Sequence, residues 1–69
     1  MSNDTLRQAL GELNGQRDIE LHFERAPELT VTNAMLVPDE EDHLVKLTDG
    51  KHVYVIDAPR VAEARIAME

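Results

Sequence analysis

The sequence predicts a small, mainly β domain in which a short N-terminal helix precedes four or five short strands. Three observations indicate this fold class: a helical hydrophobic period near the N-terminus, a change to period 2 from Arg17, and an Asp-Gly pair between two β-prone runs. A length of 69 residues leaves room for one domain, so we expect residues 1–69 to fold as a single unit.

The N-terminal segment has the spacing of a short amphipathic helix over residues 3–14. Four apolar side chains share one face under the i, i+3, i+4, i+7 pattern: Leu6, Ala9, Leu10 and Leu13. Three adjacent polar residues could cap its start: Asn3, Asp4 and Thr5. Asn14-Gly15 is a natural stop, because glycine accepts the left-handed conformation beyond a helix end. Such a short helix is unstable alone in water, so we expect its leucines to dock on the rest of the domain.

Two strands are expected after this helix. Ile19, Leu21 and Phe23 alternate with polar residues, which is typical of a half-buried strand. Ala26-Pro27 interrupts this pattern, and a second strand is predicted from Leu29 to Val37. Its alternation is imperfect, because its apolar residues fall into two groups of opposite parity: Leu29, Val31, Met35 and Val37 in one, Ala34 and Leu36 in the other.

A hairpin is the clearest local signal. Residues 43–48 and 51–56 are both β-prone, and Asp49-Gly50 between them is a favoured two-residue turn. This turn would place Thr48 opposite Lys51 and Leu47 opposite His52. One face would then carry His43, Val45, Leu47, His52, Tyr54 and Ile56, and the other Leu44, Lys46, Thr48, Lys51, Val53 and Val55. Both faces are partly apolar, which favours a strongly bent barrel or a sheet whose second face a partner covers.

The C-terminal segment, residues 59–69, allows two readings. Pro59 near a first turn, followed by Ala, Glu, Arg and Met residues, favours a helix on propensity. Residues Val61 to Ile66 could equally form a short closing strand.

A helix followed by short strands and one tight hairpin suggests an SH3-like small barrel, and the chain resembles a diverged member of the Sm-like (LSm) family from about Leu6 to Ile66. Three stretches carry the resemblance: Asn14-Gly15-Gln16 entering the first strand, Asp42 to Leu47 as the third strand, and Val53 to Val61 as the fourth strand, short turn and start of the fifth. The resemblance implies a five-stranded barrel over residues 16–66, a strand rather than a helix near the C-terminus, and assembly into rings.

The positions that the family uses to bind RNA are poorly matched. The asparagine expected before the apolar pair of the third strand is His43, and the base-stacking position two residues earlier is Glu41. The basic turn between the last two strands falls at Asp57-Ala58. The resemblance therefore implies an oligomeric barrel without the usual RNA pocket. The residues that could still contact RNA are His43, Tyr54 and Arg60.

Charge disfavours nucleic acid and lipid partners. Seven Lys and Arg residues against fourteen Asp and Glu residues give a formal net charge of −7, which repels phosphate backbones and anionic headgroups. A basic protein partner would instead associate faster. No apolar run reaches the roughly 18 residues of a membrane span. Met1 to Asp4 lacks the features of a signal peptide, so we expect a cytoplasmic protein.

Catalytic, cofactor and metal sites are not predicted. The chain has no cysteine, its one serine is Ser2, and it carries no Gly-rich phosphate loop, so we expect a non-enzyme without a cofactor. The histidines His22, His43 and His52 are interpreted as surface residues rather than metal ligands. The acidic run Asp39 to Asp42 lacks the spacing and glycine of a calcium loop and is interpreted as a solvated loop.

Self-association with binding of another macromolecule, preferentially protein, is therefore the predicted function. A barrel that is not fully closed leaves edge strands unpaired. The expected edges are Val53 to Ile56 and Leu29 to Val37, and the expected interface residues of a homo-oligomer are Val31, Val53, Val55 and Ile56. The alternative is an RNA-binding Sm-like ring, in which Arg7, Arg17, Arg25 and Arg60 would form a basic patch.

Overall fold

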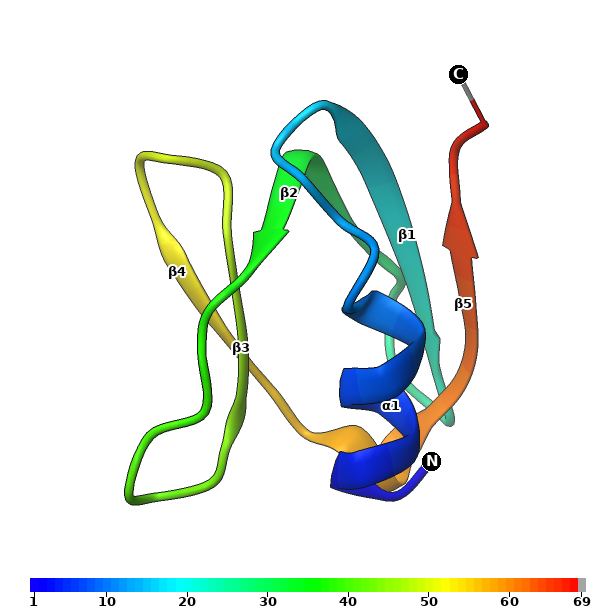
Figure 1. Cartoon of the computed structure of the whole chain (residues 1–69). Coiled ribbons are helices and arrows are strands. Elements are labelled where there is room, and N and C mark those ends of the chain that lie inside the picture. The colour runs from blue at the N-terminus through cyan, green and yellow to red at the C-terminus, as the bar shows by residue number, and fades with distance from the viewer. Residues whose placement is uncertain (69) are drawn as a thin grey trace.

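The computed structural model describes residues 1–68 and confirms a mainly β fold (Figure 1). The elements follow in this order: α1 (Asn3–Leu10), β1 (Arg17–Phe23), β2 (Leu29–Leu36), β3 (Val45–Thr48), β4 (Val53–Ile56), the 3₁₀ turn η1 (Ala58–Arg60) and β5 (Val61–Ile66). The strands form one antiparallel sheet in the order β4-β3-β2-β1-β5. The five-stranded sheet is confirmed, and its order ends in β4 and β5; closure of the sheet into a barrel stays a prediction. Of the two readings of the C-terminal segment, the strand is correct, and Pro59 lies in η1.

The helix α1 is shorter than predicted, and a different residue caps it. The Ser2 hydroxyl oxygen accepts a hydrogen bond from the Thr5 amide at 3.1 Å, so the three predicted caps are wrong. The helix ends at Leu10 rather than at residue 14. The chain then unwinds toward β1, and the Gly15 amide donates to the Ala34 carbonyl at 3.0 Å with a positive φ of 85°. Leu13 is buried although it lies outside the helix.

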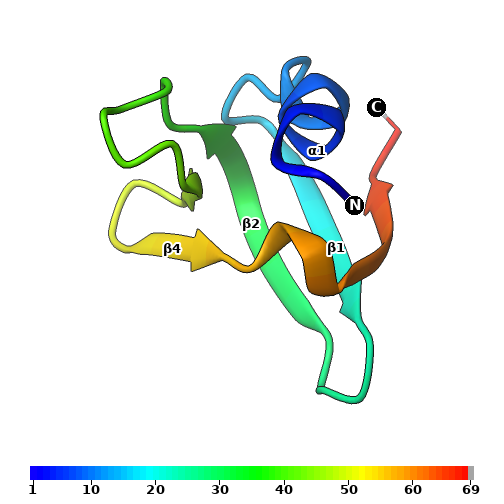
Figure 2. The same cartoon turned by 90° about the horizontal axis from the view of Figure 1, so that it is seen from below.

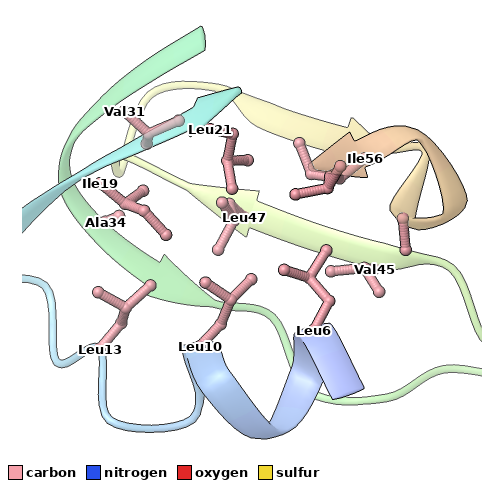
Figure 3. Close-up of a cluster of buried hydrophobic side chains, with 12 residues drawn as sticks. Leu6, Leu10, Leu13, Ile19, Leu21, Val31, Ala34, Val45, Leu47 and Ile56 are labelled. Carbon is pink, nitrogen blue, oxygen red and sulfur yellow. The ribbon is translucent and has the colours of Figure 1, made fainter. Parts of the chain in front are cut away.

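The core lies between α1 and the sheet. Twelve buried apolar residues form it: Leu6, Leu10, Leu13, Ile19, Leu21, Val31, Ala34, Val45, Leu47, Ile56, Ala58 and Val61. Figure 3 shows the three leucines of the N-terminal segment pointing toward the side chains of the strands. The predicted docking of the helix is therefore confirmed, with the exception of Ala9, which is exposed. Burial of its leucines against the sheet supplies the stability that so short a helix lacks on its own.

A β-bulge explains the imperfect alternation in β2. Asn33 has a positive φ of 50°, and its amide donates to the Asp18 carboxylate at 3.0 Å. The register between β1 and β2 shifts at the same place. Before the bulge Val31 faces the core, and after it Ala34 does, because one extra residue exchanges the two faces of a strand. Leu29 and Val31 before the bulge and Ala34 and Leu36 after it thus face the same core, whereas Met35, after the bulge, is 46% exposed.

The predicted register of the β3–β4 hairpin is wrong by two positions. Leu47 pairs with Tyr54 rather than with His52. The turn is centred on Gly50-Lys51 instead of Asp49-Gly50, and the Asp49 amide donates to the His52 carbonyl at 3.4 Å. A two-position shift leaves each side chain on its predicted face, since strand faces alternate with period 2. The inner face is accordingly buried or half-buried, and Val53 and Val55 face outward.

The turn residue Gly50 gives a test of this hairpin. Its φ is +90°, and a Cβ placed there would meet no atom within 4 Å. We expect Gly50→Val to lower stability by about 1–3 kcal/mol, because a β-branched residue resists positive φ. Thermal denaturation measures this effect. Gly11→Ala is the control, since Gly11 has φ −63° and a Cβ there would meet the Gln8 and Arg7 carbonyl oxygens at ordinary contact distances of 3.4 and 3.5 Å. The melting temperature of this variant should stay equal to that of the wild type or rise slightly. Equal melting temperatures for Gly50→Val and wild type would contradict the turn.

Candidate functional site

The strand β4 is an open, apolar edge of the sheet. Val53 and Val55 are each 60% exposed. Asp49 and His52 form a hydrogen-bonded pair of the β3–β4 ladder. In an antiparallel ladder, hydrogen-bonded pairs alternate with pairs whose backbone groups point away from each other. Tyr54 and Ile56 therefore direct their backbone groups toward β3, and Val53 and Val55 direct theirs away from the sheet. Two residues of β4 thus present both a free backbone and an exposed apolar side chain.

The strand β5 forms the opposite edge by the same reasoning. The Ala67 amide donates to the Asp18 carbonyl at 3.0 Å, which sets the alternation of the β1–β5 ladder. The backbone groups of Ala64 and Ile66 consequently point away from β1. Their side chains are half-buried and pack against the core. β5 therefore also offers unpaired donors and acceptors beside an apolar surface.

The lysine opposite Val55 is held by carboxylates, whereas Lys51, in the turn before β4, is exposed. Lys46 lies opposite Val55 in the β3–β4 ladder. Its ammonium group donates to Asp42 at 2.7 Å and to Glu40 at 2.8 Å, and its side chain is 16% exposed. The hydrogen bond with Asp42 raises the pKa of Lys46 and lowers the pKa of Asp42. A lysine projecting from an edge normally discourages pairing, and here it is folded back into the acidic loop. Leu44 near it is 44% exposed, which extends the apolar surface.

Two of the four predicted interface residues are exposed on this edge, and two are buried. Val53 and Val55 are exposed on β4. Val31 is fully buried, because β2 lies between β1 and β3 and is not an edge. Ile56 is 4% exposed, because its position in β4 faces the core. The prediction of Leu29 to Val37 as an edge is therefore wrong, and β5 takes its place.

The three residues predicted as RNA contacts lie in three different segments, and each contacts a carboxylate. His43 lies in the loop before β3, with a positive φ of 55°, and its ring is 3.2 Å from Asp39. The strand β3 begins at Val45, so the prediction that it starts at His43 is wrong. The other two contacts are a hydrogen bond from the Tyr54 hydroxyl to Asp49 at 3.0 Å and an Arg60–Asp57 ion pair at 3.2 Å. Two further arginines of the predicted basic patch also lie beside carboxylates: Arg7 pairs with Asp39 at 3.4 Å, and Arg17 pairs with Glu12 at 3.9 Å.

The Asp49 carboxylate organises the tip of the hairpin. It accepts hydrogen bonds from the amides of His52 at 2.7 Å and Lys51 at 2.8 Å, and from the Tyr54 hydroxyl at 3.0 Å. These bonds, led by that from the His52 amide, hold the pKa of Asp49 well below its ordinary value. The hydrogen bond with Asp49 raises the pKa of the Tyr54 hydroxyl. The charged form of Asp49 is thus part of the folded hairpin.

This arrangement predicts a pH dependence of stability. The pKa of Asp49 is lower in the folded chain than in the unfolded chain, so its contribution is complete above about pH 4 and is lost as the pH falls toward the folded value. We expect Asp49→Asn to be less stable than wild type at pH 7, and the difference to shrink below about pH 4. Urea denaturation from pH 7 to pH 2 measures both curves. A constant difference across this range would contradict the role of the charge.

Sequence reasoning missed one cluster of metal-ligating side chains. Glu20, His22 and Glu28 lie together on the outer face of the sheet, with one ligand atom of each within 4.8 Å of the others. The spacing Glu-Leu-His, which puts two ligands on one face of a strand, was the available signal. Glu28 gives no such signal, because it joins the cluster only through strand pairing.

Comparison of the chain with protein-family models, with curated proteins and with solved structures gave no match. Within residues 1–68, the one α-helix is too short to cross a membrane, and none of the described helical segments has the length and apolarity of a span. Any functional assignment therefore depends on the geometry above.

Proposed function

We propose that this chain is a non-catalytic Sm-like module that self-associates through the edges β4 and β5 and binds another macromolecule, preferentially a protein. The observation that carries the proposal is the pair of open sheet edges, above all β4 with Val53 and Val55 each 60% exposed. Natural proteins guard such edges with charge or proline, or pair them with another chain. No proline or lysine lies within Val53–Ile56, and Lys46 beside it is engaged by Asp42 and Glu40.

The two edges differ, and this favours a head-to-tail contact. Pairing β4 of one copy with β5 of the next uses each edge once and leaves the same two edges at the ends of the growing assembly. Such heterologous contacts close into rings when the rotation between copies divides a full turn. The Sm-like resemblance implies a helix followed by five strands, with a short turn between the last two. The elements of this chain follow the same order, which supports the proposal of a ring-forming Sm-like module.

A chain of this size also gains stability by associating. Small domains bury a modest share of their surface, and self-association is one of the usual ways to compensate. There are no cysteines to form disulfides. The net charge of −7 and the carboxylates beside each predicted RNA contact favour a protein partner over RNA.

Sedimentation or light scattering of the purified chain tests the proposal. We expect a mass that is a multiple of 7.8 kDa at micromolar concentration. A monomeric mass would overturn the self-association. An RNA gel shift at increasing salt concentrations tests the choice of partner. Tight RNA binding that weakens steeply with salt would replace the protein-binding proposal by an RNA-binding ring.

A further inference from the structure

The outer face of the sheet carries a histidine surrounded by carboxylates. His22 lies on β1, between β2 and β5. Glu20 precedes it by two residues and shares its face, and Glu63 of β5 pairs directly with it. The β1–β2 ladder pairs Glu20 with Thr30 and Leu21 with Leu29. Continuing this register places Glu28 opposite His22, near the end of the β1–β2 hairpin that projects from the body of the molecule in Figure 2.

Two of these carboxylates approach the imidazole closely. Glu20 Oε1 lies 2.6 Å from His22 Nε2, and Glu28 Oε2 lies 3.5 Å from His22 Nδ1. The side chains of His22, Glu20 and Glu28 are 29%, 38% and 58% exposed, so an ion in solution can reach them. Ligand atoms around a tetrahedral zinc ion are about 3.4 Å apart, as bonds of about 2.0–2.2 Å require. The present separations are up to 4.8 Å, and the two carboxylates face different nitrogens of the ring. Binding of one ion through a single nitrogen therefore requires one carboxylate to rotate to the side of the other, and Glu28 is the more exposed of the two.

The local charge favours a cation. Glu20, Glu28 and Glu63 contribute three negative charges to this face, and Arg65 contributes one positive charge. Arg65 forms two hydrogen bonds with Glu63, at 2.9 and 3.3 Å. The hydrogen bond from Arg65 lowers the pKa of Glu63, which keeps that carboxylate ionised and engaged. Glu20 and Glu28 are therefore the carboxylates available to a bound ion, and Glu63 with Arg65 borders the site.

We propose that Glu20, His22 and Glu28 form a binding site for a divalent transition-metal ion of the zinc class, with water completing its coordination. One imidazole nitrogen and two carboxylate oxygens are a donor set that Zn²⁺ accepts, whereas Mg²⁺ and Ca²⁺ prefer oxygen ligands alone. Two ligands lie on a central strand and one at the end of its hairpin, so the sheet holds them in place. The site does not depend on self-association.

The other two histidines provide matched controls. His43 lies near Asp39 and His52 near Asp49, and their side chains are 75% and 71% exposed. Each of these histidines has one such carboxylate contact among residues 1–68, and Asp49 already accepts three hydrogen bonds in the hairpin. His52→Ala should therefore leave metal binding unchanged.

Calorimetric titration of the full chain with ZnCl₂, in a buffer that does not bind zinc, tests the site. We expect one ion per chain, and at least about tenfold weaker binding for His22→Ala and for Glu28→Gln. His52→Ala should bind as wild type does, and MgCl₂ should give no comparable binding. At one fixed zinc concentration, the melting temperature of the wild type should also rise more than that of Glu28→Gln.

Three results would overturn the proposal: absence of zinc binding to the wild type, wild-type affinity in Glu28→Gln, or an equal loss in His52→Ala. Glu28→Gln decides the matter if His22→Ala fails to fold, because Glu28 is exposed and lies outside the core. None of these three results bears on the mass of the assembly, so the site and the proposed self-association can fail separately.

Discussion

Replacement of Leu10 by alanine should lower the free energy of unfolding by about 2–5 kcal/mol. Leu10 is fully buried in the core between α1 and the sheet. Its truncation leaves a cavity, and it removes much of the surface by which a helix of eight residues docks. A chain of 69 residues has a total stability of about 3–10 kcal/mol. The variant should therefore unfold at a much lower urea concentration and be partly unfolded at 37 °C.

Gln8→Ala is the control for this prediction. Gln8 lies on the same helix and is exposed, so its replacement should change stability by less than about 0.5 kcal/mol. Urea denaturation followed by circular dichroism compares the two variants with the wild type. A loss below about 1 kcal/mol for Leu10→Ala would show that the helix is not part of the cooperative core.

Replacement of Val55 should convert the proposed assembly into monomers. Val55→Lys places a charge on the β4 edge, where a neighbouring chain would pair. Val55→Pro removes an amide that points away from β3, so it should keep the bonds within the sheet while abolishing one to a neighbour. Because Val55 is 60% exposed, we expect both monomers to stay folded. Light scattering should report a mass near 7.8 kDa for both.

Thr32→Lys separates this effect from a general effect of charge. Thr32 is exposed on β2, which lies inside the sheet order. This variant should keep the wild-type mass. The β4 edge would be excluded as the contact if Val55→Lys and Val55→Pro retained that mass, or if Thr32→Lys lost it as readily.

Local sequence was sufficient for features that depend on neighbours along the chain. The change of hydrophobic period at Arg17 predicted the helix and the strands, because side chains face the core every 3.6 residues in a helix and every second residue in a strand. The same alternation correctly placed Val53 and Val55 on one face of the hairpin and Tyr54 and Ile56 on the other, despite the wrong register.

Features that depend on contacts across the fold were decided by the tertiary structure. The order β4-β3-β2-β1-β5 buries Val31 and makes β5 an edge, which no pattern within β2 or β5 reveals. The position of the hairpin turn is a local exception, because Asp49 accepts hydrogen bonds from the amides two and three residues later and the turn is centred on Gly50-Lys51. The spacing of Glu20 and His22 is visible in the sequence, whereas the β1–β2 hairpin brings Glu28 to His22 and the β1–β5 ladder brings Glu63 to it. Strand faces follow from local geometry, but strand neighbours depend on which pairings bury the most apolar surface, and that is a property of the whole chain.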